Sequence, residues 1–150
     1  MYRWGYVTPL TFTEVTGSTA ADIVIRFATG DHGDGWSFDG KSGILVHGFY
    51  PPPNGGDIAG DIHLDEDEDW FYGYLYQVAL HEVGHALGLQ HSPLTAAVMY
   101  EYFAPKDVLH PDDIAGIHSL YGWRPDKWEL LDNNRTTASI HSGSTGIGVP

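Results

Sequence analysis

One stretch of the sequence decides its fold, His81-Glu82-Val83-Gly84-His85-Ala86-Leu87-Gly88-Leu89-Gln90-His91, which fits the pattern H-E-x-x-H-x-x-G-x-x-H. On a helix, His81 and His85 lie one turn apart on the same face, so both imidazoles can reach one tetrahedral zinc ion. Glu82 can hold a water molecule without being a ligand. Gly88 allows a sharp turn that returns His91 as the third ligand. The fourth position is left to water, which is typical of a catalytic zinc site.

A chance occurrence is the alternative to be weighed, because a His-x-x-x-His pair alone is often an ordinary surface or core pair. Here five fixed residues stand at fixed spacing. Typical residue usage gives a chance match in roughly one of 10^5 chains of this size. The pattern therefore indicates a zinc site rather than a coincidence.

The composition limits the classes of function. With 150 residues, of which 42% are hydrophobic, the chain is long enough for a single domain with its own core. A net charge of −13 and seven scattered basic residues argue against a nucleic-acid partner. Neither a membrane span nor a signal peptide is expected, because no apolar run approaches the roughly 18 residues of a span and the N-terminus lacks the signal pattern. Since the chain has no cysteine, histidines and carboxylates are the metal ligands at hand.

The order of apolar, turn and helix-capping residues predicts an α+β fold. We expect a helix end or an irregular lead-in at residues 2–6, strands at 21–27, 44–49 and 61–65, a helix at 74–89 that carries the zinc motif, and a helix at 111–121. Five glycines among acids make residues 30–43 a long ordered loop. Residues 1–123 are predicted to be the folded domain. Residues 124–150, with a last apolar patch at 128–131, are predicted to be a polar Ser/Thr/Gly-rich tail or linker.

Three histidines outside the motif form a second candidate site. His47 and His63 fall on strands that can lie about 4.8 Å apart and face each other across the sheet. The loop that contains His32 and Asp34 could fold over them. Three nitrogens and one oxygen would then close a tetrahedral structural zinc site. From spacing alone, ordinary polar loop histidines are an equal alternative.

The same loops are rich in carboxylates and glycines. The acidic run at residues 65–69 would by itself usually be a solvated loop. Calcium, however, takes six to eight oxygen ligands, many of them backbone carbonyls that glycine-rich loops can turn inward. Two zinc and two calcium ions would bring the net charge from −13 to about −5, so the acidic excess is best explained as a supply of ligands.

Four stretches together resemble the catalytic domain of the matrixins, the matrix metalloproteinase family of the metzincins: residues 7–12, 30–49, 60–65 and 81–100. Ser92 directly after the third histidine is the matrixin choice among metzincins. Val98-Met99-Tyr100 resembles the family's Met-turn, in which Met99 lies beneath the zinc. The prolines at 51–53 are most similar to bacterial, karilysin-like members. The resemblance implies a metzincin fold: a twisted mixed β-sheet, an active-site helix and a C-terminal helix.

The resemblance also implies residue roles. Glu82 would be the general base beside a catalytic zinc on His81, His85 and His91. A structural zinc would be held by His32, Asp34, His47 and His63. One calcium ion would be bound by Asp39, Gly40, Ser42, Ile44, Asp65 and Glu68, and a second by Asp22, Asp57, Ala59 and Asp61. Substrate would contact the edge-strand residues Leu45 and Val46, and the specificity pocket would include Gln77, Glu101 and Phe103.

The function implied is that of a secreted, monomeric zinc endopeptidase acting on extended protein or peptide substrates. A non-catalytic binding module of the same fold is the alternative, and Glu82 argues against it because a module that only binds needs no base. Two departures from the family stand out. Glu101-Tyr102-Phe103 replaces the usual Pro-x-Tyr of the pocket wall, so no cleavage preference is predicted. The family's N-terminal strand is also expected to be missing, because only a few residues precede Val7.

Overall fold

The computed structural model describes residues 1–16, 21–102 and 104–124 of the chain. The elements in these ranges are α1 (Tyr2–Val7), β1 (Ile25–Ala28), β2 (Val46–Gly48), the 3-10 turn η2 (Gly56–Ile58), β3 (Ile62–Asp65), α2 (Tyr72–Ala86) and α3 (Pro111–Tyr121). None of the helices in these ranges combines the length and the apolar character of a membrane-spanning segment. Apart from Arg124, the predicted tail with its apolar patch at 128–131 lies outside the described residues, as does Phe103.

The sheet is mixed, with the strand order β1-β3-β2. β1 runs parallel to β3, and β2 pairs with β3 in antiparallel register so that His47 lies opposite His63. All four residues of β3 are buried, whereas three of the four residues of β1 are exposed. The buried central strand thus carries one candidate ligand, and its antiparallel neighbour carries another. The predicted α+β class and the cross-strand histidine pair are confirmed.

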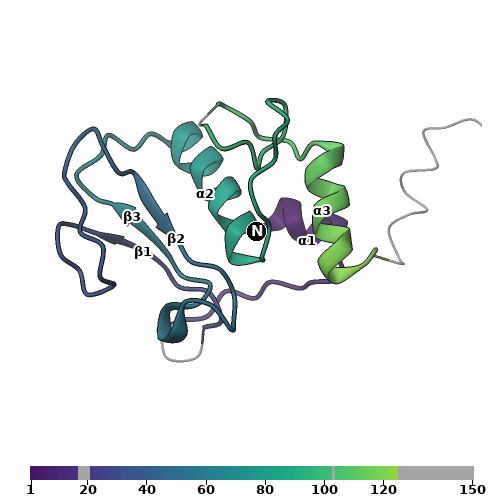
Figure 1. Cartoon of the computed structure of the whole chain (residues 1–150), viewed down its shortest axis with the longest axis horizontal. Coiled ribbons are helices and arrows are strands. Elements are labelled where there is room, and N and C mark those ends of the chain that lie inside the picture. The colour runs from purple at the N-terminus through teal and green to yellow at the C-terminus, as the bar shows by residue number, and fades with distance from the viewer. Residues whose placement is uncertain (17–20, 103, 125–150) are drawn as a thin grey trace, which may run out of the picture.

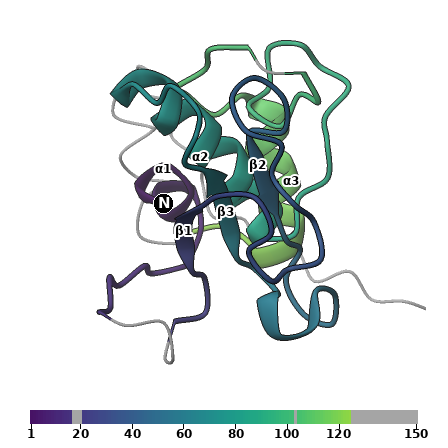
Figure 2. The same ribbon diagram turned by 90° about the vertical axis from the view of Figure 1, so that its left-hand side faces the viewer.

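Helix α2 separates the sheet from the other two helices. It packs against β2 and β3, while α1 and α3 contact each other (Figure 1). The view from the side shows the three strands next to α2, with α3 behind them (Figure 2). The zinc motif at the C-terminal half of α2 therefore lies between the sheet and the segment that leads to α3.

The core lies between α2 and its neighbours and is centred on Trp4, Ile62, Leu64, Val83, Met99 and Ile117, each at most 2% exposed. Trp4 lies on α1, and its indole N–H donates to the carbonyl of Leu80 on α2 at 3.0 Å. A buried indole usually needs such a partner, because an unpaired N–H would lose its hydrogen bond to water. This contact fixes the short α1 against the zinc-motif helix.

The predicted end of the active-site helix was wrong. The helix predicted at residues 74–89 would include the motif from His81 to Leu89, but α2 ends at Ala86. Gly88 has a φ of +99°, a left-handed conformation that a helix cannot continue through. Strand β1 likewise starts at Ile25 rather than residue 21, because the N–H of Val24 bonds to the side chain of Asp61 instead of joining the ladder between strands. The 3-10 turn at Gly56–Ile58 was not predicted.

Candidate metal centre

The three histidines of the motif converge on one point. His81, His85 and His91 each offer a ring nitrogen, and these three nitrogens all lie within 4.8 Å of one another. The Nε2 atoms of His85 and His91 are 3.1 Å apart. Two nitrogens bound to one tetrahedral zinc at about 2.05 Å lie roughly 3.3 Å apart, so this spacing fits zinc. The turn at Gly88 is what brings His91 back towards the helix.

Two backbone carbonyls orient these imidazoles. Nδ1 of His81 donates to the carbonyl of Val98, and Nδ1 of His85 donates to that of Leu89, both at 2.7 Å. Since a neutral imidazole has one proton, these bonds leave the Nε2 lone pairs for a metal ion. Burial lowers the pKa of His81 and brings that of His85 to about 4, so both rings are neutral at pH 7, as metal ligands must be.

Glu82 is buried on the side of α2 that faces β2. Its side chain is 9% exposed, and burial raises its pKa to about 7. A Cβ atom added at Gly48 of β2 would lie 2.2 Å from Oε2 of Glu82. The carboxylate therefore occupies the space that the missing side chain of Gly48 leaves open. The sequence did not single out Gly48, because a contact between a helix and a strand has no local signature.

Met99 lies directly beneath α2. It is 2% exposed, and a Cβ atom added at Gly84 would lie 2.3 Å from its Sδ and 3.1 Å from the ring of Trp4. Gly84 is one of the two unspecified positions inside the H-E-x-x-H pattern. Because Gly84 has no side chain, the loop of Met99 (residues 92–100) can approach the helix that carries the histidines.

We predict that Gly84→Ala destabilises the protein by about 1–3 kcal/mol, because Met99 and Trp4 have little free space to move into. A control on the same helix is Gly73→Ala, where the nearest atom to the new Cβ would be 3.7 Å away. That change should be neutral or stabilising by up to about 1 kcal/mol, since alanine favours helix. Urea unfolding of both variants measures the difference. Equal stability of the two variants would contradict the packing argument.

A buried carboxylate that the sequence did not mark as functional holds the loop of Met99 in place. Asp113 in the first turn of α3 is 2% exposed. It accepts hydrogen bonds from the backbone N–H groups of Val98, Met99 and His110 at 2.8, 2.9 and 2.7 Å. An acid at this position would ordinarily be read only as favouring the start of the predicted helix at 111–121. Because Val98 also bonds His81, Asp113 connects α3 to the histidine cluster.

Ser92, at the start of this loop, forms hydrogen bonds to its end and to α3. Its N–H donates to the carbonyl of Met99 at 2.7 Å, and its hydroxyl donates to Asp112 at 2.6 Å. Ser92 and Tyr100 also form an isolated parallel bridge. The residue after His91 therefore closes a loop from the third histidine to Tyr100.

The second set of predicted ligands also comes together. Oδ2 of Asp34 lies 2.8 Å from Nε2 of His32, 2.8 Å from Nδ1 of His63 and 3.2 Å from Nδ1 of His47. His32, Asp34 and His63 form the second described group whose ligand atoms all lie within 4.8 Å of one another. His32 and Asp34 come from the 30–43 loop and His63 from β3, whereas His47 of β2 contacts Asp34 but lies outside this close group.

The number of ring protons available to His32 indicates that this cluster suits a cation. A neutral His32 has one ring proton, yet Nδ1 faces the carbonyl of Gly30 and Nε2 faces Asp34, each at 2.8 Å. Both neighbours are acceptors, so one ring nitrogen lacks a suitable partner unless the ring is charged or binds a metal ion. Burial alone would raise the pKa of Asp34, but bonds from Trp36 and the three histidines hold it well below its usual range. The donor set of three nitrogens and one carboxylate oxygen fits a closed zinc site.

The first group of predicted calcium ligands surrounds the loop at residues 39–44. Asp39 accepts from the N–H of Ile44 at 2.9 Å, and Glu68 accepts from that of Ser42 at 2.6 Å. Oδ2 of Asp65 is buried and has no hydrogen-bond partner among the described residues. An unpaired buried carboxylate oxygen is costly unless an ion or water meets it. The carboxylates do not gather into one of the described metal clusters, so calcium here stays a prediction.

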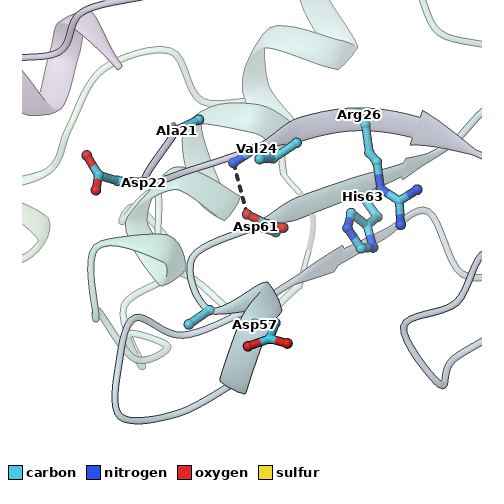
Figure 3. Close-up of a pocket in the computed structure, with 8 residues that line it drawn as sticks. Ala21, Asp22, Val24, Arg26, Asp57, Asp61 and His63 are labelled. Carbon is cyan, nitrogen blue, oxygen red and sulfur yellow. Dashed lines mark hydrogen bonds between the residues drawn. The ribbon is translucent and has the colours of Figure 1, made fainter. Parts of the chain in front are cut away.

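The second group lines one pocket. Asp22, Asp57, Ala59 and Asp61 all border a cavity of about 370 Å³ beside the start of β1. Figure 3 shows the carboxylates of Asp22, Asp57 and Asp61 well apart from one another, with Asp61 bonded to the N–H of Val24 at 3.0 Å. These carboxylates also do not form one of the described close clusters. A calcium site that takes many carbonyl ligands would not require them to do so.

The predicted substrate-binding residues lie in several places. Val46 begins β2, an edge strand, and the carbonyl of the preceding Leu45 accepts from Asp65 of β3 at 3.0 Å. Gln77 is half-buried in α2, and Glu101 is exposed just after Tyr100. The outer edge of β2 has no partner strand among the described residues.

A helix with two histidines four residues apart, a buried glutamate and a third histidine after a glycine turn defines a zincin-type metal centre. The sequence matches the family described as Matrixin over residues 1–122. The chain therefore belongs to the matrixins, a family of zinc metalloendopeptidases.

Three similar proteins illustrate the family. Karilysin of Tannerella forsythia is 45% identical over 125 residues, covering 80% of this chain and 26% of the relative. Interstitial collagenase of Equus caballus is 52% identical over 125 residues, with 79% and 26% covered. Macrophage metalloelastase of Oryctolagus cuniculus is 45% identical over 150 residues, with 93% and 31% covered. The chain spans about a quarter to a third of the length of these relatives.

Proposed function

We propose that this chain is a secreted zinc-dependent endopeptidase that hydrolyses peptide bonds in extended protein substrates. The observation that carries the proposal is the position of Glu82, buried on α2 between two of three convergent histidines. Among the described residues, the Glu82 carboxylate has no hydrogen-bond partner. Its placement next to the ligands is explained by a role as general base.

In the proposed reaction, His81, His85 and His91 hold the catalytic zinc. Zinc, when bound, lowers the pKa of water to about 7 and polarises a carbonyl group. Glu82 accepts the proton of the attacking water and passes it to the leaving amine. The carbonyls of Val98 and Leu89 keep the imidazoles in the tautomer that binds metal.

An extended peptide is the proposed substrate. A strand can add to the outer edge of β2, where Leu45 and Val46 lie, and thereby place its backbone alongside the metal centre. Gln77, Glu101 and Phe103 are proposed to shape the specificity pocket. The names of the relatives, a collagenase and a metalloelastase, agree with proteins as substrates.

The direct test is the cleavage of an internally quenched fluorogenic peptide by the folded chain with zinc and calcium supplied. We expect cleavage that a zinc chelator abolishes and added zinc restores. A folded, zinc-loaded chain that cleaves no member of a varied peptide set would instead be a binding module of the same fold. Circular dichroism must accompany the assay to show that the chain is folded.

A structural zinc on His32, Asp34, His47 and His63 is proposed beside the catalytic one. Metal analysis should therefore find two zinc ions per chain. Asp34→Ala removes the oxygen on which the three histidines converge and should leave one zinc per chain. Two zinc ions in that variant would contradict the assignment, as would one in the parent chain.

Two calcium ions are also proposed, at the 39–44 loop and at the pocket of Asp22 and Asp61. Removing calcium with a calcium-selective chelator should lower the melting temperature by several degrees, because an ion that binds only the native state stabilises it. Adding calcium back should restore it. An unchanged melting temperature would exclude both sites as ligands of the folded protein.

A further inference from the structure

A groove on the far side of the molecule from β2 has no role in the proposed reaction. It has a volume of about 430 Å³ and runs between α1, the residues before α3, and the end of α3. Its apolar lining includes Tyr2 and Tyr6 of α1, Val108 and Ile114, and Trp123 after α3. Trp123 packs on the ring of His118 with ring centroids 3.9 Å apart.

The groove exposes large apolar side chains to water. Tyr2, Val108 and Trp123 are 79%, 59% and 68% exposed. A single exposed apolar residue is ordinary, but several around one concave surface mark a place where another segment binds. The groove floor is already continuous with the core through Leu109, which is 8% exposed.

The groove is also basic, although the chain is acidic. The chain has seven lysines and arginines and a net charge of −13, yet Arg3 and Arg124 both line this one groove. Arg124 donates to the carbonyl of Gly5 at 2.6 Å, and Arg3 donates to the hydroxyl of Tyr76 at 3.3 Å. An occupant that combines apolar and acidic side chains would match both properties.

We propose that the groove is the docking site of residues 128–132 of the same chain, Trp128-Glu129-Leu130-Leu131-Asp132. The described part of the chain ends at Arg124, which itself lines the groove, so the next residues start from its rim. Trp128 is four residues further on, a reach of up to about 14 Å. The segment supplies three large apolar side chains for the groove and two carboxylates for its arginines. The remaining larger apolar residues of the tail, Ile140, Ile147 and Val149, stand singly among small or polar residues.

Docking would also support the metal centre. The wall of the groove includes Ile114 and His118 of α3, the helix whose Asp113 holds Val98 and Met99. His118 donates through Nε2 to the carbonyl of Val7 at 2.7 Å, which joins α3 to α1 across the groove. A segment bound there would hold α1 and α3 together, so losing it should lower the stability of the whole domain.

The first test compares two triple variants of the full chain. Combining Trp128→Ala, Leu130→Ala and Leu131→Ala should lower the melting temperature by about 4 °C or more. Combining Ile140→Ala, Ile147→Ala and Val149→Ala in the same tail should leave it within about 1 °C of the parent, because the proposal gives these residues no part in docking. Equal melting temperatures for both variants and the parent would overturn the proposal.

The second test uses the absence of native cysteines. Val108→Cys on the groove is paired with Leu130→Cys in one chain and with Ile147→Cys in a matched chain. Under mild oxidation, the first pair should form an intramolecular disulfide at least about tenfold faster than the second. Equal rates would mean that the segment has no preference for the groove. If the chain with Val108→Cys and Leu130→Cys instead forms disulfides between two molecules, the groove binds the segment of a second copy. That result would also overturn docking within one chain.

Discussion

Replacing Glu82 with glutamine is expected to lower kcat/KM for a peptide substrate by about 10²- to 10⁴-fold, the usual contribution of a general base. Glutamine keeps the shape of the side chain but cannot accept the proton of the attacking water. The three histidines are unchanged, so the variant should bind zinc with the parent stoichiometry. Comparing initial rates and zinc content of the two proteins measures the effect.

The loss cannot be ascribed to unfolding, because the carboxylate is itself unfavourable in its site. Burial raises the pKa of Glu82 to about 7. A carboxyl group with a raised folded-state pKa lowers stability as the pH rises from its unfolded pKa through the folded one. A neutral glutamine avoids this cost in the metal-free protein, so its melting temperature should equal or exceed that of the parent. Glu14→Gln, at an exposed position, serves as the control with parental activity. Parental activity in Glu82→Gln would remove Glu82 from the mechanism.

Replacing Asp113 with alanine is expected to lower the free energy of unfolding by about 3–5 kcal/mol. The change leaves the N–H groups of Val98, Met99 and His110 without their charged acceptor, and hydrogen bonds to charged groups are worth about 1.5–3 kcal/mol each. Such effects are not additive, so the total falls short of three separate bonds. Urea unfolding of the zinc-loaded protein measures the loss.

The control for this variant is the neighbouring Asp112→Ala. Asp112 is exposed and accepts one bond, from the hydroxyl of Ser92, so its removal should cost about 1 kcal/mol or less. A second readout separates a positioning role from a purely structural one. Because Val98 orients His81, Asp113→Ala should also weaken zinc binding by roughly 10- to 100-fold. The zinc affinity of Asp113→Asn should lie between those of the parent and Asp113→Ala. Equal losses for Asp112→Ala and Asp113→Ala would contradict the account of the loop.

The sequence predicted those parts of the site whose residues follow the periodicity of a helix or a strand. The spacing of His81, Glu82 and His85 on a helix, the return of His91 after Gly88, and the pairing of His47 with His63 follow from helix and strand periodicity. The structure brings each of these groups together. Periodicity could also place α3, whose start at Pro111 and end before Gly122 are marked by turn and capping residues.

The rest depends on contacts between distant segments or on backbone groups. The carbonyls of Val98 and Leu89 orient the histidines, but a backbone carbonyl has no residue type that a pattern could detect. Asp113 looked like an ordinary acid of a helix start, and only the packing of α3 shows that it also bonds the loop of Met99. The role of Gly84 likewise emerges only from the proximity of Met99.

Mapping the products from a protein substrate tests the central proposal most directly. The folded, zinc-loaded chain is incubated with an unfolded protein, and the new peptide ends are identified by mass spectrometry. We predict cleavage at internal peptide bonds that disappears with a zinc chelator and returns when zinc is added. The absence of new internal ends, from a chain that is folded and carries zinc on His81, His85 and His91, would contradict the assignment as an endopeptidase.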